Sequence, residues 1–81
     1  MKKIRKNIFN FTVIFEPAEE GGFVVYVPAL PGCHTQGETL DEAYGQAKDA
    51  IYGYLKTLKD LRKEIPEETG NSIIAKIPIK I

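Results

Sequence analysis

The sequence predicts one α+β domain in which two strands, a short third strand, one long helix and a last strand follow one another along 81 residues. Two observations lead to this order. Apolar and polar residues alternate near the start and at the end of the chain, a period typical of half-buried strands. Between these stretches, apolar residues recur every three or four positions over residues 40–61, which predicts an amphipathic helix.

The first strand is predicted over residues 8–16, where the odd positions are aromatic or β-branched. A polar connection ending in Gly21 and Gly22 leads to a second strand over residues 23–27, which is apolar on both faces. The two strands and the short connection between them predict a hairpin. Its second strand is expected to be central in the sheet, or covered on its outer face by another chain.

A turn and a short third strand are predicted over residues 28–37. Pro28 has no backbone N–H, so it ends the preceding strand. Pro31 and Gly32 stand at the two central positions of a type II turn, where proline fixes φ and glycine accepts a positive φ. Gly37 then ends the short strand.

The long helix is predicted to begin after Thr39 and to end near Lys63. Thr39 and Glu42 have the spacing of a capping box, in which the Thr oxygen accepts an otherwise unpaired backbone amide. Ile65 precedes a proline and is therefore disfavoured in a helix, which indicates the end. The basic residues near position 60 suit the negative end of the helix dipole.

A last strand is predicted over residues 73–81, where Ile or Ala occupies every odd position. Pro78 cannot donate a ladder hydrogen bond, so this strand should lie at an edge of the sheet. The helix can cross over between parallel strands, and such crossovers are almost always right-handed. One core would then lie between the helix and the odd faces of the first and last strands.

Composition excludes several classes of protein. Eleven Lys and Arg balance eleven Asp and Glu, so overall charge does not draw the chain to nucleic acid or to a membrane. Residues 1–7 are basic and are expected to be a flexible start to a single domain over residues 1–81. No apolar run is long enough to span a bilayer, and one cysteine fits a reducing compartment. We expect a cytoplasmic protein that self-associates as a homodimer or homotetramer.

Cys33 and His34, the only cysteine and histidine, are the first candidates for chemistry. Adjacent side chains on an extended segment point to opposite faces, so a thiol and its base would not meet there. A metal site would need further ligands, and the chain has no other Cys or His. We expect a buried thiol and an exposed imidazole at an interface. A hydrolase using Cys33 is the weaker alternative.

Other chemistry is not expected. The interior of the first strand and the whole last strand contain no acid, which argues against a metal-dependent nuclease. The glycines at 21–22 are not followed by the Lys-Ser/Thr of a phosphate-binding loop. The sequence therefore predicts a non-enzymatic protein with no catalytic residue, no metal and no cofactor.

Two sets of residues suggest protein interfaces instead. Gly45, Tyr52 and Gly53 lie off the apolar stripe of the helix, where glycine costs up to about 1 kcal/mol relative to Ala. One explanation is solvent exposure; the other is a partner backbone approaching that side, with Tyr52 as an anchor. The second set is apolar and is expected on the outer face of the sheet, where it would mark association. It comprises Ile14, Val24, Tyr26 and Ile74.

Three short segments occur in a fixed order over residues 16–51: a hairpin ending in Gly-Gly-aromatic, then Val-Pro-x-Leu-Pro-Gly-Cys, then Gly-x-Thr-x-x-Glu-Ala leading into the helix. The residues are Gly21, Gly22, Phe23, Val27, Pro28, Leu30, Pro31, Gly32, Cys33, Gly37, Thr39, Glu42 and Ala43. This pattern resembles the HicB antitoxin family and covers nearly half of the chain.

The resemblance implies a partial ribonuclease H-like fold without nuclease activity. It also implies the strand order third, second, first, fourth, with the fourth strand parallel to the first and at an edge. Members of the family bind a small HicA-type toxin that cleaves mRNA and block its active site. Many also have a C-terminal DNA-binding segment. This sequence ends at Ile81 without one, so we expect no DNA binding by this chain alone.

Two functions follow as hypotheses. The first is an antitoxin-like protein that binds and occludes a small basic HicA-type toxin. The second is a solitary self-assembling scaffold or ligand-binding module of the same fold that has no toxin partner. Binding to a small basic neighbour, with loss of RNA cleavage, would distinguish the first from the second.

Overall fold

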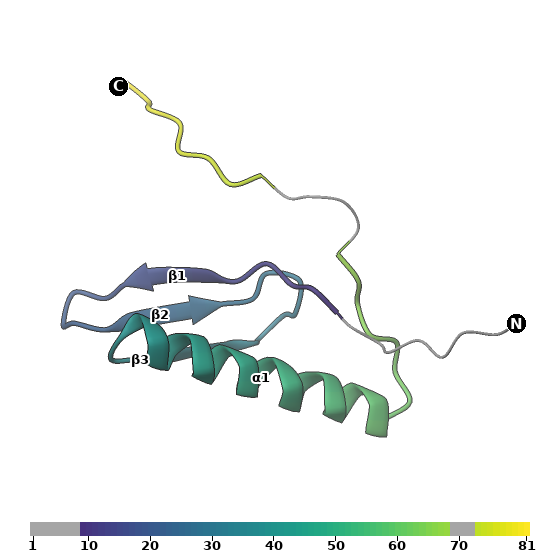
Figure 1. Cartoon of the computed structure of the whole chain (residues 1–81). Helices are drawn as coiled ribbons and strands as arrows, with labels where there is room; N and C mark the ends of the chain where they lie inside the picture. Colours follow the sequence, from purple (N-terminus) through teal and green to yellow (C-terminus); the bar gives the residue numbers. More distant parts are fainter. Residues whose placement is uncertain (1–8, 69–72) are drawn as a thin grey trace, which may run out of the picture.

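The computed structural model describes residues 9–68 and 73–81, and it contains three strands followed by one long helix (Figure 1). In chain order these are β1 (Ile14–Pro17), β2 (Phe23–Tyr26), β3 (His34–Gly37) and α1 (Leu40–Asp60). The expected basic start over residues 1–7 lies outside the described residues.

The strands form an antiparallel sheet in the order β1-β2-β3, and α1 packs on one face of it (Figure 1). The register places Phe15 and Thr35 on either side of Val25. The helix contacts mainly β3 and then β2. The predicted α+β class, with a three-stranded antiparallel meander and one long helix on one face, is confirmed.

The first strand is shorter than the sequence predicts, because β1 begins only at Ile14. Ile14 pairs with Tyr26, the last residue of β2. After Tyr26 the backbone that follows β2 turns away from β1. The Leu30 N–H donates to the Val27 carbonyl at 2.9 Å, and Pro28 has no N–H with which to continue the ladder. Residues 9–13 therefore run past the end of their partner strand.

The predicted type II turn is present. The Cys33 N–H donates to the Leu30 carbonyl at 2.9 Å, and Gly32 has a φ of 81°. The Val27 N–H also donates to the Cys33 carbonyl at 3.1 Å, so the turn closes directly onto the start of β3. These bonds position Cys33 and His34.

The helix begins as predicted. Thr39 is its N-cap, and the Thr39 hydroxyl accepts the Glu42 N–H at 3.1 Å. The Glu42 carboxylate reaches one residue further back than a capping box requires and accepts the Glu38 N–H. A Cβ on Gly37 would lie 2.5 Å from the Ala43 nitrogen, so only glycine allows the helix start to approach β3 this closely.

The helix ends at Asp60, three residues before the predicted end. Leu61 is the C-cap, and Arg62 adopts a left-handed φ of 59°. The Lys63 N–H donates to the Leu58 carbonyl and the Arg62 N–H to the Lys59 carbonyl. This pattern closes the helix by a Schellman-type turn, ahead of the proline that the sequence prediction relied on.

The core lies between the sheet and α1 and forms two clusters. One contains Val25 with Ala43 and Ala47, and the other contains Val27, Leu30 and Cys33. Alanine at two successive turns lets the helix lie close to the sheet. Three members of the predicted apolar stripe are instead exposed, because they lie at the helix ends or to one side of the sheet contact: Leu40, Tyr44 and Leu61.

The predicted fourth strand is the main difference between sequence and structure. Residues 73–81 are extended and exposed, form no strand, and run away from the sheet (Figure 1). A strand needs a hydrogen-bonded neighbour, and within the described residues none lies beside this segment. The alternation of Ile and polar residues in the sequence indicates which face of a strand would be buried. It does not show that a neighbouring strand is present to form the backbone hydrogen bonds.

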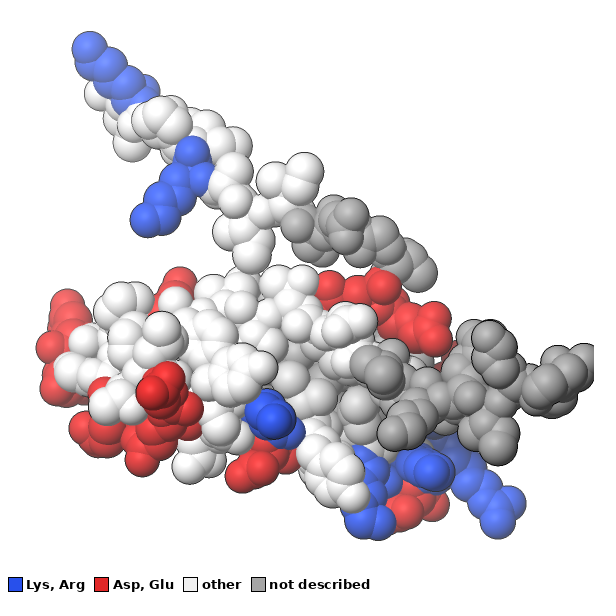
Figure 2. Space-filling model, in the orientation of Figure 1, with Lys and Arg blue, Asp and Glu red and all other residues white. Residues whose placement is uncertain are grey.

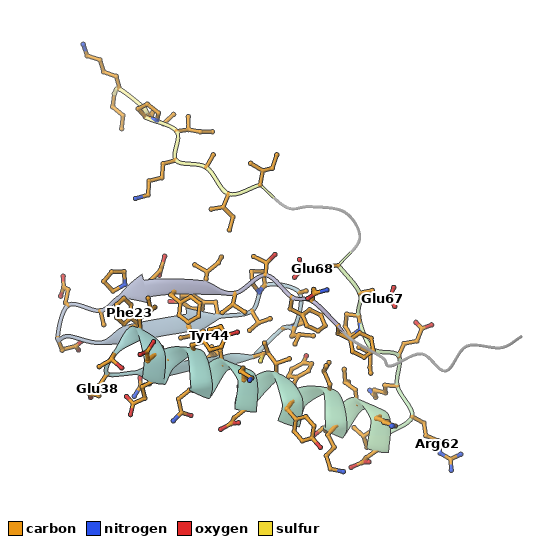
Figure 3. All side chains as sticks on the ribbon, in the orientation of Figure 1. Phe23, Glu38, Tyr44, Arg62, Glu67 and Glu68 are labelled. Atoms are coloured by element: carbon orange, nitrogen blue, oxygen red, sulfur yellow. The ribbon has the colours of Figure 1, made fainter. Side chains whose placement is uncertain are left out.

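The chain between α1 and this segment returns to the start of β1. The carboxylate of Glu68 accepts both the backbone N–H and the hydroxyl of Thr12, the latter at 2.7 Å. Figure 3 shows Glu67 and Glu68 on this returning segment. Within the described residues, no helix is both long enough and apolar enough to cross a membrane.

Candidate protein-binding surfaces

The sheet has one face packed against α1 and one outer face, on which two rows of side chains cross the three strands. The register sets Ile14, Tyr26 and His34 side by side in the first row. The second row is Glu16, Val24 and Gln36. These six residues are called the outer sheet face below. Ile14 and Val24 are half-buried, whereas Tyr26 is 41% exposed and His34 is exposed.

This geometry brings together four of the residues that the sequence assigned to interfaces: Ile14, Val24, Tyr26 and His34. An aromatic ring, an imidazole and two aliphatic side chains share one surface. Such a mixture, partly apolar and carrying a tyrosine, is characteristic of protein interfaces.

Ile74, the fourth residue that the sequence predicted on the outer sheet face, is not there. It lies in the extended C-terminal segment, 65% exposed and outside the sheet. The physical reason is the one given for the strand itself: the segment has no backbone partner in the single chain.

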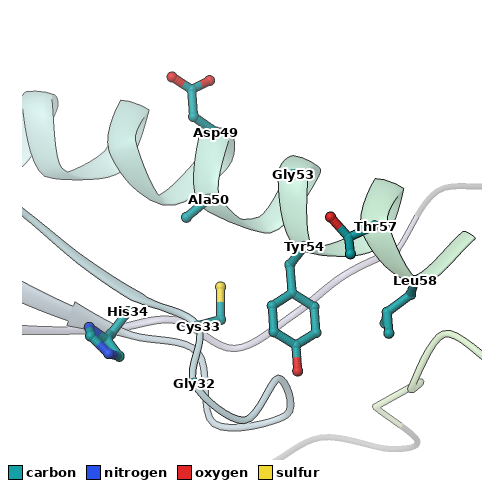
Figure 4. A pocket seen from close by; sticks show the side chains of 9 residues that line it. All are labelled: Gly32, Cys33, His34, Asp49, Ala50, Gly53, Tyr54, Thr57 and Leu58. Atoms are coloured by element: carbon teal, nitrogen blue, oxygen red, sulfur yellow. The ribbon is translucent and has the colours of Figure 1, made fainter. Parts of the chain in front are cut away.

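Cys33 and His34 lie on opposite sides of the chain. The sulfur of Cys33 points toward α1 and the His34 ring points away from it (Figure 4). Cys33 is buried and His34 exposed, so the pair does not form a nucleophile and its base. Burial raises the pKa of the Cys33 thiol above its ordinary value, which disfavours the reactive thiolate.

The hollow beside this pair has a volume of about 360 Å³ and lies between the start of β3 and the second half of α1 (Figure 4). Tyr54 crosses it, and its hydroxyl donates to the Pro31 carbonyl at 2.8 Å. The hollow is therefore closed on one side by a bond between helix and turn. No group of three or more Cys, His, Asp or Glu residues suited to a metal occurs in the described ranges.

The three helix residues singled out from the sequence do not form one surface. Gly45 and Tyr52 are seven positions apart and share a side of α1, where Tyr52 is 69% exposed. Gly53 instead lines the hollow next to Cys33. Outside the adjacent residues and backbone of α1 itself, no described atom lies within 4 Å of a Cβ built on either glycine, so packing inside the chain requires neither.

Charged side chains are unevenly distributed over the molecule, although the numbers of acidic and basic residues are equal. Residues 9–47 contain six carboxylates and no Lys or Arg. Figure 2 shows Asp and Glu at the end of the molecule that carries the β1–β2 connection and the start of α1, whereas both charge signs occur near the other end of the helix. We call the first end the acidic end; it comprises Glu16, Glu19, Glu20, Glu38, Asp41 and Glu42.

The acidic end adjoins the outer sheet face. A hollow of about 760 Å³ is lined there by Val24 and Gln36 of the sheet and by carboxylates of Glu20, Glu38 and Glu42. Figure 3 places Glu38 and Phe23 at this same end. The sequence analysis did not single out these acids as a surface. The signal for this acidic surface is the run of residues 7–47, which contains no Lys or Arg.

Comparison with known proteins adds the decisive observation. Residues 11–77 match the model of a family described as the HicB-like antitoxin of bacterial toxin-antitoxin systems. The chain belongs to the HicB-like antitoxin family. The match includes both rows of the outer sheet face, the acidic end and the first part of the exposed C-terminal segment.

The chain is similar both to proteins named UPF0150 and to proteins named antitoxin HicB. A UPF0150 protein of Thermoplasma acidophilum is 46% identical over 79% of this chain and 93% of its own length. A UPF0150 protein of Synechocystis is 38% identical over 78% of this chain and 80% of its own length. Antitoxin HicB 1 of Photorhabdus laumondii is 38% identical over 78% of this chain, but only 40% of that antitoxin is covered. The family resemblance that the sequence motifs suggested is thus confirmed.

Proposed function

We propose that this protein is a non-enzymatic, cytoplasmic antitoxin that binds a small basic HicA-type toxin and blocks its cleavage of mRNA. Membership of the HicB-like antitoxin family supports this role. Two relatives are named antitoxins, from Photorhabdus laumondii and Escherichia coli. The proposed mechanism is steric: a folded surface covers the toxin's active site, and no chemistry is required of the antitoxin.

The observation that carries the proposal is the meeting of the outer sheet face with the acidic end. A protein that cleaves RNA must attract phosphates, so its active surface is basic. Six carboxylates with no Lys or Arg in the same 39 residues complement such a surface. Tyr26 and His34 supply the apolar and hydrogen-bonding contacts next to it.

The acidic end and the outer sheet face are proposed to contribute to toxin binding in different ways. The carboxylates of Glu20, Glu38 and Glu42 steer the basic toxin, so their effect should weaken as ionic strength rises. The row Ile14–Tyr26–His34 is desolvated in the complex and fixes the toxin's position. In this proposal the toxin does not touch Gly45 and Tyr52, which lie on the side of α1 that faces away from the sheet.

The test takes as candidate toxin a small basic HicA-type protein, sought first in the gene next to the one that encodes this chain. The two proteins are co-expressed and co-purified, and cleavage of a short RNA is measured with and without this chain. We expect a stable complex and loss of cleavage at equimolar amounts. If the purified neighbour cleaves RNA at the same rate with this chain present, the antitoxin role is wrong.

Variants locate the surface. Tyr26→Ala should weaken toxin binding by about tenfold or more, as expected for an interface tyrosine. Tyr52→Ala, which removes an exposed tyrosine from the helix, is the matched control and should leave the affinity nearly unchanged. The reverse result would move the interface to the helix. Glu38→Gln should lower the association rate at low salt and have little effect at high salt.

The fold of the functional protein is proposed to include a fourth strand over residues 73–81, parallel to β1, as in a partial ribonuclease H-like sheet. The return of residues 61–68 to the start of β1, held by Glu68 on Thr12, supports this placement. Pro78 suits the outermost position of such a sheet.

A further inference from the structure

The described C-terminal residues are the most exposed apolar part of the chain. Over residues 73–81 every residue is exposed, with exposed fractions of 75% at Ile77 and 76% at Ile79. Five isoleucines in nine residues leave a large apolar area in water, which in a soluble protein marks a surface that another element covers. In the single chain nothing described covers it.

β1 forms an edge of the described sheet, and this edge could pair with such a segment. Within the described residues β2 is the only strand that pairs with β1, so the other side of β1 presents unpaired backbone groups. Residues 9–17, which contain β1 and its extended approach, number nine, as do residues 73–81. Both stretches span roughly 30 Å when extended.

The two faces of the segment fit those of β1. The odd positions of the segment are apolar, like Val13, just before β1, and Phe15 of β1, which pack against the core and are only half-buried. The even positions include Lys76 and Lys80, and the outer side of β1 carries Glu16, followed by the acids of the β1–β2 connection. A parallel strand in this orientation extends the apolar face and places lysines beside carboxylates.

Within one chain the segment does not occupy this edge. The chain reaches the start of β1 at Glu68, which is bonded to Thr12, and residues 73–81 then extend away from the sheet (Figure 1). A second copy has the same free edge and the same exposed segment. Reciprocal donation would bury both segments about one two-fold axis.

We infer that two copies of this chain exchange residues 73–81, each segment adding a parallel strand to the β1 edge of the other copy. The inference concerns self-assembly and does not depend on toxin binding. Ile74 then comes to the outer sheet face of the partner copy, and the fourth strand of the proposed fold is supplied between chains.

The first experiment measures the mass of the full chain by native mass spectrometry and by light scattering, without any other protein. The expected result is a dimer. Ile77→Asp should raise the dimer dissociation constant by about 100-fold, because it places a charge where an apolar side chain is buried. The helical part of its far-UV circular dichroism should be unchanged, since Ile77 is outside the core of the single chain.

Tyr52→Asp is the matched control: it introduces the same charge at an exposed position of the helix. It should leave the dimer intact. A monomeric full chain overturns the inference. Dissociation by Tyr52→Asp, or a dimer that Ile77→Asp does not weaken, also overturns it, because either result places the contact elsewhere.

The second experiment separates exchange from docking within one chain. A ¹⁵N-labelled chain with benzoylphenylalanine in place of Lys76 is mixed with an unlabelled chain, unfolded, refolded and irradiated. Exchange predicts crosslinks from the labelled segment to unlabelled peptides containing β1. Crosslinks found solely within the labelled chain, or to unlabelled peptides from another part of the fold, overturn the exchange.

Discussion

The hydroxyl of Tyr54 donates to the carbonyl of Pro31 at 2.8 Å and so ties the middle of α1 to the turn between β2 and β3. The two residues are 23 positions apart. The bond matters because the turn lies beside the core cluster of Val27, Leu30 and Cys33.

Tyr54→Phe should lower the free energy of unfolding by about 1 kcal/mol or less, because the ring still packs and a solvent-accessible hydrogen bond is lost. Tyr54→Ala should cost about 3 kcal/mol, since the ring also leaves the second core cluster. Urea unfolding followed by circular dichroism measures both. Equal losses for the two variants would contradict a dominant packing role.

Gly37→Ala should destabilise the fold by about 2 kcal/mol or more. The added Cβ would lie 2.5 Å from the Ala43 nitrogen, so the start of α1 must move away from β3. Thermal unfolding gives the loss.

Gly45→Ala is the control for the same substitution inside the helix. Outside the adjacent residues and backbone of α1, no described atom lies within 4 Å of the added Cβ, so we expect a gain of up to about 1 kcal/mol from helix propensity. If this stabilised variant still binds the toxin normally, the hypothesis of a partner backbone at Gly45 is excluded.

Cys33 should react slowly with iodoacetamide at neutral pH and quickly only in urea, because the thiol is buried and burial raises its pKa. Fast labelling of the folded protein would contradict its burial. Cys33→Ala has no thiol to titrate, so it is also the reference when the free energy of unfolding is measured as a function of pH.

The sign of that dependence follows from the raised pKa. The folded state holds its thiol proton to higher pH than the unfolded state does, so unfolding is favoured when that proton can be released. The stabilisation is complete below the unfolded pKa and is lost as pH rises through the folded pKa. Relative to Cys33→Ala, the native chain should lose stability as the pH rises above the ordinary thiol pKa of about 8.5.

Glu68→Ala should loosen the return of the chain to β1 and lower stability by about 1–2 kcal/mol, because two hydrogen bonds from Thr12 to a carboxylate are removed. Thr12→Val removes the hydroxyl bond alone. A double-mutant cycle with these changes should give a coupling energy near 1 kcal/mol. Additive effects would mean that the pair does not act as a unit.

Much of the fold was readable from local rules. The type II turn at Pro31–Gly32 and the N-cap at Thr39 depend on residues within four positions of one another, and both are present where predicted. The family motifs also lie in this stretch, and the family model confirms them. Boundaries were less predictable, since β1 begins opposite the last residue of β2 and α1 ends where Arg62 adopts a left-handed φ.

The candidate surface was readable in part. Alternation alone put Ile14, Val24 and Tyr26 on one face, because side-chain direction in a strand has a period of two. It did not reveal that His34 completes the row of Ile14 and Tyr26, which depends on how β2 and β3 are registered. The acids of the β1–β2 connection and of the helix start came together only in three dimensions.

The sequence by itself determined the elements that depend on near neighbours: the hairpin, the turn, the helix and its start, and the family to which they belong. Tertiary structure alone decided which side chains share a surface and whether residues 73–81 find a partner. The reason is physical. Turns and caps are closed by bonds within a few residues, whereas a strand is stabilised by a backbone that must come from elsewhere.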